Sequence, residues 1–302
     1  MPVAMVVGLV LHSLVGQLDF LTPYLIFAML FFPFCGVRLS DLKITKLHIY
    51  LLVFQAVVSV GVYFALRPLD PVLAQGAMIC TIAPTATSAV VVAAMLGARV
   101  STMLSYSLLI NVAVAVGAPL FFSAIAPDLS TISPDLSAVA PPDGGVSFWV
   151  SFVTILRRVI PILVLPFVAS LLLRRFAPRL ANGVQRYGRV SFWLWLVALT
   201  IVTGKVVGFI SAQEGLTLGR GLMFAGVGLV ACLVQFGVGR YIGRRTGDTV
   251  AGGQSLGQKN TILAIWLAQT YLNPLSSIAP ASYVLWQNLV NTYQLWRRTH
   301  RK

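Results

Sequence analysis

Residues 251–261 read Ala-Gly-Gly-Gln-Ser-Leu-Gly-Gln-Lys-Asn-Thr and lead directly into the apolar segment Ile262–Ala268. Amides, glycines, hydroxyls and one lysine therefore stand inside a chain that is otherwise apolar. Irregular polar backbone at membrane depth is tolerated only where protein buries it or water reaches it. An ionisable group there marks a functional site by default. If this stretch lies within a bilayer, we expect it to handle the substrate or the coupling ion.

The composition is that of a polytopic membrane protein. Of the 302 residues, 58% are hydrophobic and 10% are charged, whereas soluble domains carry about 25% charged residues. The length suits about eight to ten spans of roughly 20 residues each. The net charge of +14 does not indicate a nucleic-acid partner, because the basic residues cluster in particular loops, as the positive-inside rule describes.

No motif in the sequence predicts an enzyme. Paired acids, a nucleophile elbow and a nucleotide-binding loop are all missing from the sequence, so we predict neither catalysis nor an ATP-driven pump. We expect no cofactor other than a coupling ion. The first residues lack the charged region of a cleavable signal and are expected to begin the first span. The three cysteines lie in apolar surroundings, without the spacing of a metal site or a disulfide framework: Cys35, Cys80 and Cys232.

Apolar runs between charges and turn residues predict ten membrane-spanning helices. The fourth and the ninth are interrupted by polar and small residues, and the first is short. The boundaries are uncertain by two to four residues. The ten segments are 3–17, 21–37, 47–66, 71–97, 101–125, 156–173, 190–211, 221–239, 249–271 and 276–296.

The charges give this layout an orientation. With the N-terminus inside, the cytoplasmic loops and the C-terminus hold sixteen of the 22 Lys and Arg residues, and six of the eight acidic residues fall outside. An odd number of spans would scramble that separation. We therefore expect ten spans in the cell (inner) membrane, with both termini in the cytoplasm.

The chain divides into two halves of five spans. Residues 1–125 form the first half, the loop 126–146 is an extracytoplasmic linker rich in Pro, Ser and Asp, and residues 147–302 form the second half. Because five is an odd number, the second half starts from the opposite side of the membrane, so the two repeats are inverted. Interrupted helices at corresponding positions of inverted halves point to the binding site of a transporter.

The chain resembles the bile acid:sodium symporter family over nearly its whole length. The resemblance rests on Ala83-Pro84-Thr85-Ala86-Thr87-Ser88 in the fourth span, on Gln254 and Gln258 in the ninth, and on Gln55 in the third. It implies that the fourth and ninth helices are unwound and cross near the midplane. It also implies a core of spans 3, 4, 5, 8, 9 and 10, a panel of spans 1, 2, 6 and 7, and an organic anion bound between them, such as a bile acid, pantothenate or a keto acid.

The same resemblance implies two sodium sites, from which this sequence departs. The second site would be formed by Gln55, Gln254 and Gln258, but Gln254 stands where the family has a glutamate. The first site takes a Ser-Asn pair after the proline of the fourth span, and here Ser88 is followed by alanine. Hydroxyl positions of the fifth span align with Ser107 and Asn111.

Lys259 stands at the crossover itself and bears on the choice of coupling ion. A sodium ion bound 4 Å from the Lys259 ammonium would be repelled by about 4 kcal/mol, even at an effective dielectric constant of 20. We expect its ammonium to replace one sodium ion and to donate hydrogen bonds to Gln254, Gln258 or Gln55. Since removal from water favours a neutral amine, this lysine would allow coupling to protons, and the driving ion, sodium or a proton, stays open. Alternatively, Lys259 neutralises a bound anionic substrate, or it snorkels from a misplaced helix end.

Two helix starts are expected to face the anion, because the N-terminal end of a helix carries partial positive charge. Span 10 adds an amide face, and the arginines of span 6 are expected to be interface anchors. The residues concerned are Pro84, Thr85, Thr87 and Ser88 in span 4; Lys259, Asn260 and Thr261 in span 9; Gln287, Asn288 and Asn291 in span 10; and Arg157 and Arg158 in span 6.

The sequence therefore predicts an all-α integral membrane protein that moves a small organic anion by alternating access. Its partners would be that anion and the lipid bilayer, with no obligatory protein partner. Three alternatives stay open. The first is a sodium-coupled symporter that uses the glutamine site, the second is an uncoupled facilitator or channel, and the third is a membrane-embedded enzyme or sensor.

Overall fold

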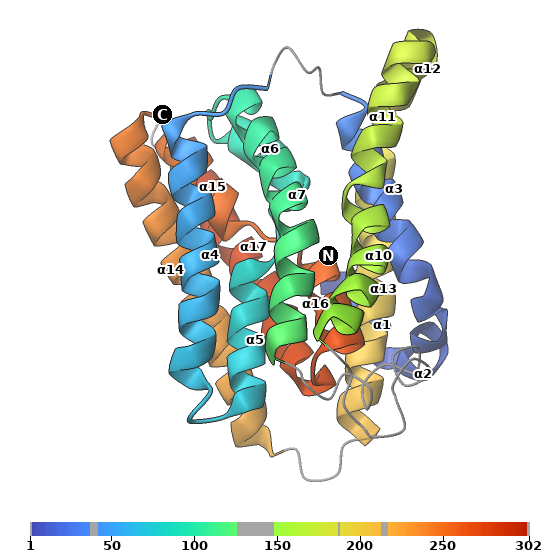
Figure 1. The fold of residues 1–302 in the computed structure, drawn as a ribbon, viewed down its shortest axis with the longest axis vertical. Helices are drawn as coiled ribbons and strands as arrows, with labels where there is room; N and C mark the ends of the chain where they lie inside the picture. The colour runs from blue at the N-terminus through green and yellow to red at the C-terminus, as the bar shows by residue number, and fades with distance from the viewer. Residues whose placement is uncertain (1, 37–41, 126–147, 187, 213–216, 301–302) are drawn as a thin grey trace. The chain divides into compact units, whose positions relative to one another are not determined.

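The computed structural model describes residues 2–36, 42–125, 148–186, 188–212 and 217–300 (Figure 1). The predicted linker 126–146 lies outside the described residues. Within the described ranges the secondary structure is helical apart from one isolated β-bridge. The elements are α1 (Pro2–Val10), α2 (His12–Val15), η1 (Gly16–Leu21), α3 (Thr22–Phe34), α4 (Lys46–Leu66), α5 (Pro71–Ile82), α6 (Ser88–Met95), α7 (Val100–Ile125), α10 (Phe148–Leu163), α11 (Leu165–Phe176), α12 (Pro178–Arg186), α13 (Gly188–Ala212), α14 (Leu218–Thr246), α15 (Thr249–Gly257), α16 (Thr261–Tyr271), η3 (Pro274–Ser277) and α17 (Ile278–Thr299).

Several of these helices suit a bilayer. Five helical stretches in the described part of the chain are long and apolar enough to cross a membrane: His12–Phe34, Lys46–Leu66, Val100–Ile125, Phe148–Phe176 and Leu218–Thr246. The first combines α2, η1 and α3, and the fourth combines α10 and α11. An all-helical chain with several such stretches fits the predicted class of membrane protein.

Helix α4 shows the same adaptation residue by residue. Its buried face carries Gln55 and Ser59, whereas its exposed face carries Val53, Val57 and Phe64, each more than half exposed. A water-soluble helix has the reverse arrangement, with its polar residues outside. The apolar exposed face is suited to contact with lipid.

Helices lie over all ten predicted segments, with three main differences, one of which is that α14 continues to Thr246, beyond the predicted end at residue 239. The first segment is split, because α1 ends at Val10 and α2 begins at His12. The sixth was predicted to start at residue 156, but α10 already starts at Phe148. There Phe148 stacks on Phe152, and Trp149 meets both rings edge to face, so these aromatic residues extend the apolar run that precedes the arginines.

The described chain forms two compact units. The first comprises residues 1–37, 112–214 and 266–275, and the second comprises residues 38–111, 215–265 and 276–302. Helices α7 and α16 each continue from one unit into the other. In the first unit, α13 packs against α1 and α3, and the Lys205 ammonium forms an ion pair with the Asp19 carboxylate.

Glycines set the close packing of α14 against α15 in the second unit, where the two helices lie side by side (Figure 1). A Cβ atom on Gly239 would collide with the backbone carbonyl of Gly252, and one on Gly252 would collide with that of Gly239. Such contacts between small residues are typical of membrane helices. The chain reverses at Gly247, whose φ of +91° is a conformation that glycine adopts without strain.

Candidate functional site

The first interruption lies between α5 and α6. Helix α5 ends at Ile82 and α6 begins at Ser88, so the break predicted from the Pro84 motif is present. Ala83 leaves the helical region with φ −51° and ψ 140°, as a residue that precedes proline prefers. Pro84 has no N–H group with which to continue the helical ladder.

The second interruption lies between α15 and α16. Helix α15 ends at Gly257, and Gln258 has extended backbone with φ −96° and ψ 96°. The Asn260 Oδ1 atom accepts a hydrogen bond from the Leu263 N–H at 3.2 Å. This contact caps the first turn of α16, where the N–H groups have no helical partner.

The two interruptions pair with each other. Thr85 and Lys259 form an antiparallel β-bridge, and Thr85 is fully buried. Side-chain and main-chain hydrogen bonds extend the pairing, so buried backbone groups that no helix satisfies are satisfied across the crossing. They run from Ala86 N to Gln258 O at 2.9 Å, from Asn260 N to Pro84 O at 2.8 Å and from Thr85 Oγ1 to Ser255 O at 2.6 Å.

Side chains cap the carbonyl end of α5. The last four carbonyls of a helix have no partner within it, and here four successive carbonyls each accept from a side chain. Gln235 Nε2 donates to Cys80 O at 3.1 Å, Lys259 Nζ to Thr81 O at 3.0 Å, and Gln55 Nε2 to Ile82 O at 2.9 Å and to Ala83 O at 3.0 Å.

Lys259 is 1% exposed, and its ammonium lies at this end of α5. The position is electrostatically favourable, because the C-terminal end of a helix carries partial negative charge. The expected hydrogen bonds from Lys259 to Gln254, Gln258 or Gln55 are wrong, since the ammonium donates to the Thr81 carbonyl instead. The Lys259 side chain therefore reaches the same end of α5 that the Gln55 amide caps.

Both the nitrogen and the oxygen of the Gln55 side-chain amide form hydrogen bonds. Its Nε2 atom caps α5, and its Oε1 atom accepts from the Tyr106 hydroxyl at 3.1 Å. With these bonds Gln55 joins α4, α5 and α7. It shares no hydrogen bond with Gln254 or Gln258, so the three predicted sodium ligands do not form one hydrogen-bonded cluster.

Gln254 and Gln258 each keep a buried oxygen without a partner. Gln254 Nε2 donates to Asn291 Oδ1 at 2.9 Å and to Gln294 Oε1 at 3.2 Å, and Gln258 Nε2 donates to Ser88 Oγ at 2.9 Å. The Oε1 atoms of both glutamines are buried and accept no hydrogen bond from the residues that the structure describes. A buried amide oxygen without a donor is costly, so these two atoms fit a small cation or a donor group of a ligand.

Helix α17 presents a stripe of polar side chains to the second interruption. Its members are spaced at i, i+4, i+8 and i+11, which places them on one helix face. Asn288, by contrast, is half-buried and turns back to its own helix, where it donates to Val284 O. The stripe consists of Tyr283, which donates to Gly257 O at 2.8 Å, Gln287, which accepts from Lys259 N at 2.9 Å, and Asn291 and Gln294, which accept from Gln254.

Ser107 and Asn111 lie on the buried face of α7. Asn111 Nδ2 donates to Ser107 O at 2.6 Å, whereas Ser107 Oγ and Asn111 Oδ1 are buried and have no hydrogen-bond partner among the described residues. Of the remaining predicted residues, Thr261 is buried, Thr87 is half-buried and Ser88 is exposed. No hydrogen bond in the described chain joins Ser107 or Asn111 to the paired interruptions.

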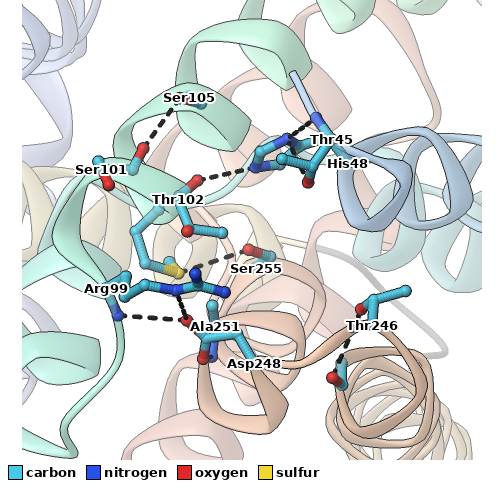
Figure 2. Close-up of polar contacts among 12 residues, drawn as sticks. Thr45, His48, Arg99, Ser101, Thr102, Ser105, Thr246, Asp248, Ala251 and Ser255 are labelled. Carbon is cyan, nitrogen blue, oxygen red and sulfur yellow. Dashed lines mark hydrogen bonds and ion pairs between the residues drawn. The ribbon is translucent and has the colours of Figure 1, made fainter. Parts of the chain in front are cut away.

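Asp248 fixes the start of α15 (Figure 2). Its Oδ1 atom caps the helix by accepting from Ala251 N at 2.9 Å, and its Oδ2 atom accepts from Arg99 N at 3.2 Å and faces Arg99 Nε at 3.5 Å. Nearby, His48 Nε2 lies 3.0 Å from the Thr102 carbonyl. These contacts hold α15 and α4 to the first residues of α7.

Several residues of this site were absent from the sequence prediction. Tyr283 and Gln294 could have been found, because with Gln287 and Asn291 they form a helical polar period on an apolar helix. Gln235 is a lone amide within α14 and gives no local signal. Thr81 contributes a backbone carbonyl, which no side-chain motif predicts.

The described residues contain no group of three or more His, Cys, Asp or Glu side chains placed to hold a metal ion. Among the atoms of the site, the oxygens left free are amide and hydroxyl oxygens, which suit a hard monovalent cation but bring no charge of their own.

No protein-family model matches the chain, and no curated protein matches it.

Proposed function

We propose that the chain is a secondary transporter of a small organic anion, with ten membrane-spanning helices arranged as two inverted repeats. Transport would occur by alternating access at the paired interruptions of α5–α6 and α15–α16. The driving ion would be a proton, with the Lys259 ammonium as the built-in cation of the site. Both termini would lie in the cytoplasm, and the membrane would be the cell membrane.

The observation that carries this proposal is the buried lysine at the paired interruptions. Lys259 lies where two broken helices meet, and its ammonium donates to the carbonyl end of one of them. A charge in the membrane interior is costly and is kept for function. The N-terminal, positive ends of α6 and α16 directly follow the paired residues Thr85 and Lys259, and such ends suit an anionic substrate.

The layout of the two halves supports inverted repeats. The broken helices are the fourth span of each predicted half, and a segment outside the helices, five residues long in the first half and three in the second, forms each break. The two compact units also support a division into moving parts. The first unit contains the predicted spans 1, 2, 6 and 7, and the second contains spans 3, 4, 8 and 10.

The role of Lys259 follows from the contacts of its ammonium. A sodium ion bound among carbonyl and amide oxygens would stabilise the negative ends of the broken helices, and the ammonium supplies that charge by itself. Deprotonation and reprotonation of the amine during the cycle would then couple transport to protons. The second candidate, sodium coupling, is favoured by a different observation, the free Oε1 atoms of Gln254 and Gln258.

Uptake into proteoliposomes tests this function. A mixed panel of organic anions is offered under an inward proton gradient, an inward sodium gradient, or neither. The proposal expects accumulation with the proton gradient alone and its loss in Lys259→Ala. In Lys259→Arg the side chain is always charged, so downhill exchange is expected to survive without accumulation. Equal uptake with and without either gradient would instead indicate a passive facilitator.

A further inference from the structure

Helices α11 and α12 join at the end of a stretch that is long enough to cross a membrane. That stretch, Phe148–Phe176, ends with the last residue of α11, and α12 begins at Pro178 and continues beyond α11 (Figure 1). Residues 171–189 contain five arginines and no acidic residue. The junction therefore brings a strongly positive segment to the end of an apolar helix.

The spacing of charges along α10 and α11 places this junction at a bilayer surface. The run 159–173 contains no charged residue and lies between the pair Arg157 and Arg158 and the pair Arg174 and Arg175. From Arg157 to Arg175 the helices cover about 27 Å, at 1.5 Å per residue, which is close to the hydrocarbon thickness of about 30 Å. Long arginine side chains reach from such positions to the headgroups. Arg175 therefore marks the boundary of the hydrocarbon layer.

Exposed apolar and charged side chains stand next to each other at this boundary. Phe176 is 77% exposed and Leu180 is 64% exposed, although both side chains are large and apolar. The residues that precede them in the chain, Arg175 and Arg179, are also exposed. Neither arginine has an ion-pair partner among the described residues. We call Arg175, Phe176, Arg179 and Leu180 the boundary surface.

The exposed apolar face of α11 leads directly to the boundary surface. The buried residues of α11 are Pro166 and Ser170. Four exposed apolar residues are spaced at i, i+3, i+7 and i+11, which places them together on another side of the helix: Leu165, Val168, Leu172 and Phe176. The side of α11 that is suited to lipid contact therefore extends to the last residue of the helix.

The remaining arginine of the junction has a structural contact instead. Arg174 Nε and Nη2 both donate to the carbonyl of Cys35, at 3.2 and 2.6 Å. Cys35 directly follows α3, so this contact satisfies a carbonyl that has no partner within the helix. Arg174 thus holds α11 to α3, whereas Arg175 and Arg179 are available to a partner outside the chain.

An anionic phospholipid matches both halves of the boundary surface. Its phosphate accepts paired hydrogen bonds from a planar guanidinium, and its acyl chains cover exposed phenylalanine and leucine side chains. From Arg175 to Leu180 the chain covers about 7 Å, which is about the depth of one headgroup layer. A soluble acidic partner would satisfy the arginines, but it would leave the apolar side chains uncovered.

We infer that the boundary surface binds an anionic phospholipid, with Arg175 and Arg179 on the phosphate and Phe176 and Leu180 against the first carbons of the acyl chains. This inference requires that the chain spans a membrane, but it does not rest on the proposed transport. With the proposed orientation, the lipid belongs to the cytoplasmic leaflet, which carries the negative surface potential.

Native mass spectrometry of the purified protein tests the inference without requiring transport. The protein in detergent is titrated with phosphatidylglycerol or with phosphatidylcholine, and the bound lipids are counted. Two arginines near an anionic surface correspond to about a thirtyfold gain in affinity, at about fivefold each. We therefore expect the wild type to prefer phosphatidylglycerol by about that factor and Arg175→Gln/Arg179→Gln to lose most of the preference. A wild type without any preference would already overturn the inference.

The matched control is Arg244→Gln/Arg245→Gln, which removes two exposed arginines from the last turn of α14. It should keep the preference of the wild type. An equal loss in this control would mean that the total charge attracts the lipid, and an unchanged preference in Arg175→Gln/Arg179→Gln would mean that these arginines do not bind it; either result refutes the site.

Two further measurements separate a lipid from a free phosphate. Phe176→Ser should weaken the binding of phosphatidylglycerol severalfold, because its acyl chains lose an apolar contact. Inorganic phosphate at millimolar concentration should not displace the lipid from the wild type. Full displacement by phosphate, together with unchanged lipid binding in Phe176→Ser, would contradict a lipid site.

Discussion

Lys259→Met removes the ammonium at the end of α5 and keeps a flexible side chain of similar length. The Nζ atom lies 3.0 Å from the Thr81 carbonyl, so the ammonium occupies a place where a small cation would meet that helix end. For a sodium ion bound about 6 Å from the ammonium, the repulsion between the two charges is about 3 kcal/mol at an effective dielectric constant of 20. Loss of that repulsion corresponds to about a hundredfold tighter binding of sodium.

The assay is binding of radioactive sodium to purified protein, with sodium-dependent thermal stabilisation as an independent readout. Lys259→Met is expected to bind sodium with an affinity about a hundredfold above that of the wild type. Lys259→Arg, which keeps the charge, should resemble the wild type. Adding Gln254→Glu to Lys259→Met should tighten sodium binding further, because a carboxylate offsets the loss of hydration of the ion. Sodium binding of equal affinity in the wild type and in Lys259→Met would refute the reasoning that the ammonium stands in for sodium.

Three further predictions concern stability, each read from thermal unfolding in detergent. Gln55→Leu leaves two carbonyls of α5 and a tyrosine hydroxyl without partners and should destabilise the protein by about 2–4 kcal/mol. Gly239→Ala should cost about 1–3 kcal/mol, because its Cβ meets a backbone carbonyl, whereas Gly237→Ala, with nothing within 4 Å, should cost nothing; equal effects would contradict the packing. Burial disfavours ionisation of Asp70, but hydrogen bonds from two backbone N–H groups and from Arg220 outweigh it and lower its pKa below the ordinary 3.8. Its stabilising contribution is therefore complete above about pH 4 and is lost as the pH falls further, so Asp70→Asn should unfold with a weaker dependence on pH below about 4; an unchanged dependence would contradict this role.

The sequence predicted the interruptions because their causes are local. Pro84 cannot continue a helical ladder, and the run of glycines and amides that ends at Lys259 cannot be a lipid-facing helix. The pairing of the two breaks was expected from family resemblance. The hydrogen bonds that make the pairing, such as Asn260 N to Pro84 O, depend on the register of two distant segments, which no local pattern fixes.

The partner of Lys259 could not be predicted from the sequence. The direction of a side chain at a break depends on the backbone angles of that residue and on the rotation of the neighbouring helices. The neighbouring amides Gln254 and Gln258 were the natural candidates, but both turn toward other helices, and the acceptor is a carbonyl of Thr81. The helix start at Phe148 was also missed, since the sequence prediction began the sixth span at residue 156.

Uptake of a panel of organic anions into proteoliposomes is the most direct test of the central claim that the chain is a lysine-dependent anion transporter. The account predicts that the wild type accumulates at least one anion when an inward proton gradient is imposed without sodium, and that Lys259→Ala does not. Strictly sodium-driven accumulation that survives in Lys259→Ala would contradict the role of the lysine. An absence of anion uptake under every gradient would contradict the proposed function itself.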